Sequence, residues 1–247
     1  MLSFDRAEPY FECFSQVTTD TELANLLDSV TREMGFAYFA LTHHVDIRRY
    51  PEKAIRLLNY PREWVEYYDA HSLGVTDPVH RASHVTNLGF AWSKLPRLIA
   101  LTRRDHEILA QGGSNGIGDG FTVPTHVPGE SHGSCSFANP AGTVLPAEQL
   151  ALAQLVGHFA FDAARRLWRV RPVDPVSVLT ERQRECVAWV AAGKTDWEIG
   201  QILGISEETV TDHLKNARDR YGGGKRTSLV ARALYDTSIT FPDIFKR

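Results

Sequence analysis

The sequence predicts an α+β protein of two unequal domains, and three observations support this prediction. At 247 residues the chain is long for one domain. Pro172 and Pro175 lie close together and cannot continue a helix, so an extended linker is expected there. Before the linker, predicted helices and strands mix without βαβ order; after it, the pattern is entirely helical. We therefore expect domains at 1–169 and 177–247, joined by a linker at 170–176.

Hydrophobic periodicity locates the elements of the first domain. The predicted helices cover residues 20–34, 61–71, 102–111 and 146–168. The predicted strands cover residues 36–41, 121–124 and 133–138.

The second domain shows the pattern of a helix-turn-helix. One apolar helix stops at Gly193, a short second helix stops at Gly204, and Ser206 is placed to cap a third. The residues of the third helix expected to face inward are Thr209, Val210, Leu214 and Ala217. Two short helices joined by a tight glycine-containing turn present the second helix to the DNA major groove.

The stretch from Gly193 to Gly222, GKTDWEIGQILGISEETVTDHLKNARDRYG, closely resembles the DNA-binding domain of the LuxR/FixJ regulators. In that family LTxRExE, GKxxxEIAxxLxIS and TVxxHxxN recur; here Gln183 replaces the first glutamate, and Thr211 a usual basic residue. The resemblance implies a cytoplasmic transcription regulator that binds double-stranded DNA and works with RNA polymerase. The candidate DNA contacts are Thr209, Val210, Thr211, His213, Lys215, Asn216 and Arg220.

The charge of the second domain bears on how it would bind DNA. Residues 175–247 hold 11 Lys and Arg against 10 Asp and Glu, whereas a DNA-binding domain usually has a basic surface. Binding by a single domain should therefore be weak. We expect a homodimer on a palindromic DNA element.

Three aromatic residues mark a candidate binding site in the first domain. Tyr60, Trp64 and Tyr68 are spaced i, i+4 and i+8, which puts them on one helical face, and Asp77 and Trp92 follow. On periodicity alone, such a stripe is core more often than pocket. However, tyrosine and tryptophan carry donors, and a nearby carboxylate needs partners, so the combination favours a polar pocket.

These residues also resemble the autoinducer-binding domain of LuxR-type quorum-sensing regulators, in which YPxxWxxxY, DP and AWS recur. The positions most typical of that domain match Trp64, Tyr68, Asp77, Pro78, Trp92 and Gly120. The resemblance implies an α–β–α sandwich around a five-stranded antiparallel sheet. It also implies an N-acyl homoserine lactone as the small-molecule effector.

The same resemblance assigns a role to each ligand-binding residue. The Trp64 indole would donate to the lactone carbonyl, and Asp77 would accept from the ligand amide. Tyr60 and Ser136 would reach the acyl carbonyl. Tyr68 and Trp92 would pack around the lactone ring, and Gly120 would leave room for close backbone approach.

Two other protein classes share parts of this sequence pattern. Gly112–Gly118 and Tyr221–Lys225 fit the GxxxGxG and YxxxK patterns of short-chain dehydrogenases, but the glycines follow a predicted helix instead of a buried strand. A response regulator shares the second domain, but it needs acidic residues after the first strand, where Thr42, His43 and His44 stand. Neither alternative is favoured, and no enzyme activity is expected.

Metal, cofactor and membrane classes are also disfavoured. The three cysteines lack CxxC spacing, which argues for a reducing cytoplasm and against zinc, and the ten histidines look scattered along the sequence. No apolar run approaches the roughly 18 residues of a membrane span, and no signal peptide is recognisable. We expect no metal site, no cofactor and no membrane association.

Overall fold

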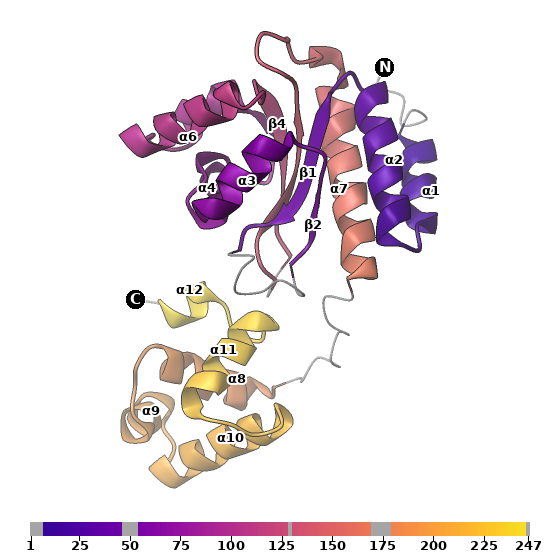
Figure 1. Cartoon of the computed structure of the whole chain (residues 1–247). Coiled ribbons are helices and arrows are strands. Elements are labelled where there is room, and N and C mark those ends of the chain that lie inside the picture. Colours follow the sequence, from indigo (N-terminus) through magenta and orange to yellow (C-terminus); the bar gives the residue numbers. More distant parts are fainter. Residues whose placement is uncertain (1–6, 46–53, 128–129, 169–178, 246–247) are drawn as a thin grey trace. The chain divides into compact units, whose positions relative to one another are not determined.

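The computed structural model describes residues 7–45, 54–127, 130–168 and 179–245 (Figure 1). The chain divides into two compact units, Met1–Val170 and Arg171–Arg247. The predicted linker lies outside the described residues.

The N-terminal unit combines helices with one sheet. Its helices are α1 (Glu8–Gln16), α2 (Asp20–Glu33), α3 (Arg62–Ala70), α4 (Pro78–Ser83), α5 (Leu95–Leu98), α6 (Arg103–Ser114) and α7 (Leu150–Leu167). The described residues also form the 3-10 turns η2 (Leu73–Val75), η3 (Trp92–Lys94) and η4 (Ala147–Gln149). Its strands are β1 (Tyr38–His43), β2 (Arg56–Leu58), β3 (Phe90–Ala91), β4 (Gly120–Thr125) and β5 (Gly133–Ala138).

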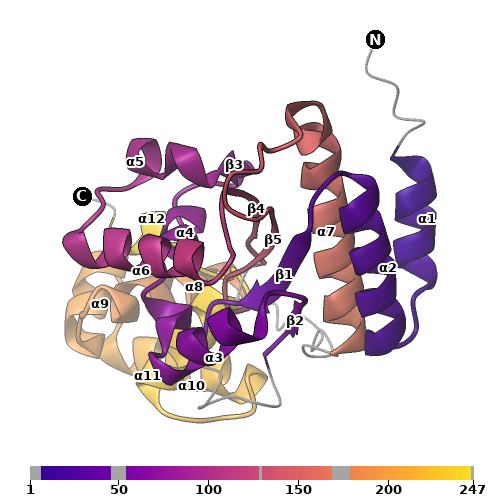
Figure 2. The same cartoon turned by 45° about the horizontal axis from the view of Figure 1, so that its top comes forward.

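The five strands form one antiparallel sheet in the order β2-β1-β5-β4-β3 (Figure 2). Strands β1 and β4 both pair with β5, so Phe39 and Phe121 lie opposite Phe137 on its two sides. The prediction of an α+β fold with a five-stranded antiparallel sheet is confirmed.

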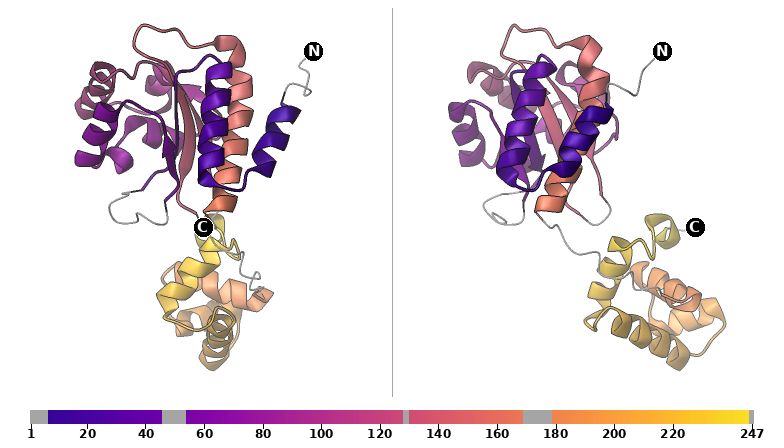
Figure 3. Two further views of the ribbon diagram at one scale, coloured as in Figure 1. Left: turned by 45° about the vertical axis from the view of Figure 1, so that its right-hand side comes forward. Right: turned by 90° about the vertical axis from the view of Figure 1, so that its right-hand side faces the viewer.

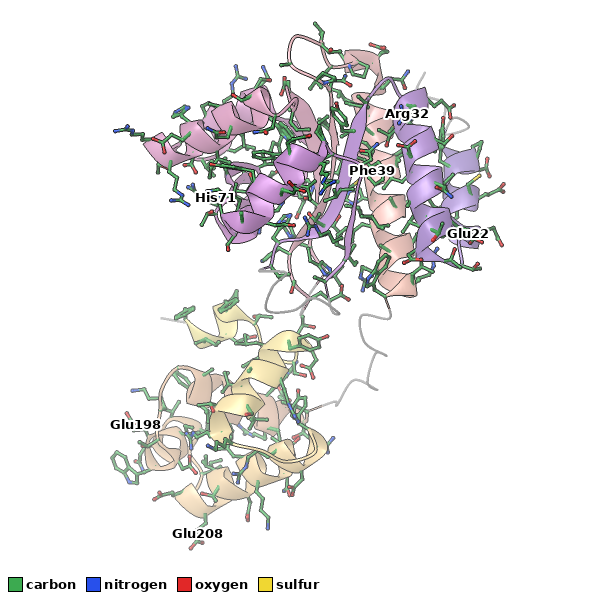
Figure 4. All side chains as sticks on the ribbon, in the orientation of Figure 1. Glu22, Arg32, Phe39, His71, Glu198 and Glu208 are labelled. Atoms are coloured by element: carbon green, nitrogen blue, oxygen red, sulfur yellow. The ribbon has the colours of Figure 1, made fainter. Side chains whose placement is uncertain are left out.

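Helices cover both faces of this sheet. Helices α1, α2 and α7 lie on one side, and α3, α4 and α6 lie on the other (Figures 1 and 3). Because successive strand residues point to opposite faces, Phe39, Leu41 and Val123 enter the core with α2 and α7. Figure 4 shows Phe39 inside this layer, whereas Glu22 and Arg32 point to solvent.

The observed elements differ from the predicted ones mainly at the sheet edges. The first strand begins at Tyr38 instead of Phe36, because the Phe36 N–H closes the end of α2 by donating to the Thr31 carbonyl. Strands β2 and β3 were not predicted, since three and two residues are too short to show a period. Helices α1, α4 and α5 were also not predicted.

The C-terminal unit consists of helices in the described residues. They are α8 (Glu181–Ala191), α9 (Asp196–Leu203), α10 (Glu207–Arg220), α11 (Arg226–Tyr235) and α12 (Phe241–Ile244). Capping boxes start α8 at Thr180 and α9 at Thr195, and Ser206 caps α10 as predicted. Gly204 ends α9 with φ +68°, the left-handed conformation that glycine adopts at low cost.

Gly157 fixes how closely α7 approaches the sheet. A Cβ at this position would lie 2.8 Å from the Val123 Cβ, so Gly157→Ala should overpack the core and lower the free energy of unfolding by about 1–3 kcal/mol. In calorimetry of the full chain, the N-terminal transition should move down by roughly 2–4 °C per kcal/mol.

Gly113→Ala is the matched control. Gly113 also lies within a helix, but a Cβ there meets nothing within 4 Å, so alanine should stabilise by about 0.5–1 kcal/mol through helix propensity. Equal shifts for the two variants would contradict the close-packing explanation.

Candidate functional site

A partly enclosed cavity of about 330 Å³ lies in the N-terminal unit, within the size range of small-molecule sites. Its floor is the sheet face opposite α7, with Ala40, Thr42 and Ser136, and its walls include Trp64 of α3 and Ile108 of α6. Most of this lining is apolar, which suits a ligand with an apolar part.

Two hydrogen-bond donors border the cavity without a protein partner. In the part of the chain that the structure describes, neither the Trp64 indole N–H nor the Tyr60 hydroxyl makes a hydrogen bond to another residue. Burial and then the charge of Asp77 raise the pKa of the Tyr60 phenol, so it keeps its proton. Both groups are therefore available to acceptors on a ligand.

A carboxylate acceptor is held rigidly beside these donors. The Asp77 Oδ1 accepts from the Val79 N–H at 2.7 Å and so caps α4, and its Oδ2 accepts from the Tyr68 hydroxyl at 3.0 Å. A carboxylate has about four lone-pair sites, so Asp77 can still accept from a ligand N–H. Burial, followed by Asp77, raises the pKa of Tyr68 well above its usual value, which keeps Tyr68 a donor.

A short hydrogen-bond chain forms another part of the wall. The Trp92 indole donates to the Thr122 hydroxyl at 2.8 Å, and Thr122 shares a 2.8 Å hydrogen bond with Ser136. Gly120 is absent from the cavity lining; a Cβ there would lie 2.6 Å from the Trp92 indole. Gly120 thus makes room for Trp92.

The structure brings the predicted residues together and adds others. Tyr60, Trp64, Tyr68, Asp77, Trp92 and Ser136 all line one cavity. The sequence did not indicate Thr42, Arg56 and His80, which also line the cavity, or Thr122, which accepts from Trp92. Thr122 and Ser136 face each other on adjacent strands, and this pairing depends on a register that no local pattern reveals.

One partly buried ion pair joins two walls of the cavity. Arg81 of α4 donates to both oxygens of Asp105 at 2.8 Å, and Asp105, only 2% exposed, also caps α6 through Thr102. Burial acts to raise the pKa of Asp105, but the hydrogen bonds from Thr102 and Arg81 outweigh it and leave the pKa lowered.

The C-terminal unit presents α10 as the candidate DNA-reading helix. Thr211, Lys215, Asn216 and Arg220 are exposed on it, and Thr209 and His213 are half-buried. Thr209 is occupied in the cap with Ser206, and the Thr211 hydroxyl donates to Asp196 of α9.

Val210 was predicted from the sequence as a DNA contact, and its position in the structure corrects this prediction. Its side chain is fully buried in the core between α8 and α10, so it supports the helix and does not reach a DNA base. The acidic start of α10 is exposed, and Glu208 points away from the domain (Figure 4).

Comparison with known proteins covers both units. Residues 19–164 match the autoinducer binding domain family, and residues 177–233 match the bacterial regulatory proteins of the luxR family. The chain belongs to the LuxR-type transcriptional regulators.

Relatives of this LuxR-type regulator extend over nearly its whole length. The transcriptional activator protein AhyR of Aeromonas hydrophila is 29% identical, covering 97% of this chain and 94% of AhyR. The quorum sensing-dependent regulator RpaR of Rhodopseudomonas palustris is 34% identical over 71% of each chain. Escherichia coli SdiA shares the fold, with a TM-score of 0.63 and 24% identity, over 95% of this chain and 98% of SdiA.

Family membership makes this LuxR-type regulator a DNA-binding, autoinducer-binding transcription factor and not an enzyme. The dehydrogenase-like glycines fit that conclusion: Gly112 and Gly113 lie near the end of α6, and Gly118 lies in the irregular segment before β4, so no strand directly precedes them. Among the described residues, no three His, Cys, Asp or Glu side chains converge to hold a metal ion. No helix in those ranges is long and apolar enough to cross a membrane.

The Arg81–Asp105 pair should be essential for a stable cavity. Asp105→Asn removes the charge facing Arg81, and we expect a loss of about 1–3 kcal/mol, because Arg81 is 38% exposed and water replaces part of its partner. Since the pKa of Asp105 is lowered on folding, this contribution is complete above its usual value near 3.8 and is lost as pH falls below it.

Denaturant titration of the full chain between pH 3 and 7 measures this effect. Glu107→Gln is the control, because the Glu107–Arg103 pair on α6 is exposed and should contribute little. A wild-type stability curve in Asp105→Asn would show that the pair does not support the fold.

Proposed function

We propose that this regulator senses an N-acyl homoserine lactone in its N-terminal cavity and binds a palindromic promoter element as a homodimer. It acts in the cytoplasm and works with RNA polymerase. The observation that carries the ligand assignment is the pair of donors on Tyr60 and Trp64, which have no hydrogen-bond partner among the described residues and lie beside an anchored carboxylate in a mostly apolar cavity.

The polar groups of an acyl homoserine lactone complement those of the cavity. The Trp64 indole N–H donates to the lactone carbonyl, and Asp77 accepts from the ligand amide. Tyr60 donates to the acyl carbonyl, with Ser136 nearby. Each satisfied hydrogen bond contributes on the order of 1 kcal/mol.

The apolar lining suits the acyl chain. Each CH₂ removed from water contributes roughly 0.8 kcal/mol, and Ala40, Leu58, Val65 and Ile108 border the cavity. After the cost of association, micromolar to nanomolar affinity is expected. SdiA has been solved in complex with octanoyl-rac-glycerol, which makes an acylglycerol the competing ligand class.

The charge of α10 supports a dimeric DNA complex. Acidic and basic side chains nearly balance on this helix, so one domain offers little attraction to phosphates. A dimer presents two such helices about one DNA turn apart and doubles the contacts.

A ligand panel tests the sensor assignment. Because ligand binding stabilises the folded state by mass action, the melting temperature of full-length protein should rise with acyl homoserine lactones of suitable chain length. Asp77→Asn keeps an oxygen for the α4 cap but offers the ligand amide an N–H. It should therefore require at least a tenfold higher lactone concentration, equivalent to about 1.4 kcal/mol.

Glu66→Gln serves as the control for charge, since Glu66 lies on α3 but faces solvent and pairs with Arg62. A larger rise with octanoylglycerol than with every lactone would replace the proposed ligand class. A wild-type dose response in Asp77→Asn would remove Asp77 from the site.

The DNA-binding assignment predicts weak binding by residues 175–247 alone and much tighter binding by the full chain. Lys215→Ala should reduce affinity and lower the log–log salt slope by about one per half-site if Lys215 contacts a phosphate. Fluorescence anisotropy with a palindromic duplex at several salt concentrations measures both. Lys94→Ala, an exposed lysine of the N-terminal unit, is the matched control; equal binding by fragment and full chain would contradict the dimer proposal.

A further inference from the structure

Five histidines that look scattered in the sequence gather at one end of the sheet. His44 follows β1, His126 follows β4, His132 precedes β5, and α4 supplies His80 and the C-cap His84. The His44 ring stacks on His80 at 3.8 Å between centroids, and the His84 and His132 centroids are 4.5 Å apart. We call these five residues the histidine cluster.

Hydrogen bonds within the histidine cluster require neutral rings. The Nδ1 atoms of His126 and His132 are 2.7 Å apart, and His126 uses its Nε2 to donate to the Ser83 carbonyl. A neutral His126 must therefore accept from His132 through Nδ1. His44 Nδ1 and His84 Nε2 lie 2.9 Å apart, so one of them must also be unprotonated. Protonating either acceptor sets two N–H groups against each other.

The histidine cluster holds α4 against the sheet, and α4 borders the ligand cavity. The Ser83 carbonyl, near the end of α4, accepts from His126, and His44 contacts both His80 and His84. At the other end of α4, Asp77 is the N-cap, and Asp77 and His80 line the cavity. Movement of α4 away from the sheet would therefore change the binding site.

The described carboxylates around the histidine cluster have hydrogen-bond or ion-pair partners other than its rings. On α3, the Tyr68 hydroxyl lies 3.4 Å from His80 Nδ1 and donates to Asp77. The Asp69 carboxylate, also on α3, accepts from Arg56 of β2. Among the described residues, the carboxylates of Glu130 and Asp105 also pair with arginines, Arg165 and Arg81. Within the ranges that the structure describes, no carboxylate contacts a ring of the cluster, so an added proton has no counter-charge there.

We propose that the histidine cluster makes ligand binding by this regulator sensitive to protons, because protonated rings repel one another and release α4 from the sheet. The proposal rests on the ligand-sensing function of the same cavity. It adds a regulatory input, acidification, to that site.

The direction of the effect follows from proton linkage. Burial, and then its four neighbouring imidazoles, lower the pKa of His44 well below its usual value, and burial followed by His126 lowers that of His132. The arrangement with α4 in place thus binds fewer protons than one with α4 released. Affinity is full above the usual imidazole pKa near 6.5 and falls as pH drops below it, about tenfold at pH 5.5 for each ring that must stay neutral.

Two measurements on the full-length protein, with EDTA present throughout, test the proposal. Amide hydrogen exchange of ligand-free protein, corrected for intrinsic rates, should show that residues 79–85 lose protection by at least tenfold between pH 7.5 and 5.5. The affinity for N-octanoyl-L-homoserine lactone should fall at least tenfold over the same interval. The double variant His84→Gln/His132→Gln, which replaces two exposed rings, should lose less than threefold in each measurement.

His106→Gln removes an exposed histidine of α6 outside the histidine cluster and should behave as wild type. Protection of 79–85 that does not change with pH, or that falls equally in wild type and the double variant, would overturn the proposal. If protection of α4 depends on pH but the lactone binds at neither pH, the histidine cluster is upheld as a proton switch and the lactone assignment is contradicted.

Discussion

Strand alternation across β1, β4 and β5 gives the sheet two chemically different faces, and both the core and the cavity depend on this difference. Phe39, Val123 and Phe137 fill one face and pack with α2 and α7. The opposite face carries smaller or polar side chains, such as Ala40 and Ser136. Apolar packing alone therefore cannot close that second face, and a cavity remains.

Hydrogen bonds and ion pairs stabilise the region around the cavity, where apolar packing is incomplete. The Arg81–Asp105 pair joins α4 to α6, and Tyr68 holds Asp77 at the start of α4. Such bonds depend on the protonation states of their partners, whereas apolar contacts do not. The cavity side of the sheet therefore carries groups whose contacts depend on protonation, and the histidine cluster lies on that side.

The stability of the C-terminal unit depends on helix capping, because its helices are short. Thr180 with Gln183, and Thr195 with Glu198, satisfy N–H groups that would otherwise lack partners. The backbone hydrogen bond from Thr195 to Glu198, with further bonds, lowers the pKa of Glu198 to about 2. The turn from α9 to α10 passes close to Gly200, where a Cβ would lie 2.8 Å from the Ile205 carbonyl oxygen. A small residue there fixes the approach of the two helices.

The sequence by itself determined the α+β class, the helix-turn-helix with its Ser206 cap and Gly204 stop, and the grouping of Tyr60, Trp64 and Asp77, which line one cavity. These features reside in local patterns, since caps, glycine turns and helical spacing act within a few residues. Tertiary structure decided the rest. Val210 is buried, Gly120 leaves space for the Trp92 indole, and strand register places Thr122 opposite Ser136. Tertiary structure also brought His44, His84 and His132 together from positions up to 88 residues apart. Such contacts form between distant segments only when the sheet is assembled, so no local pattern carries them.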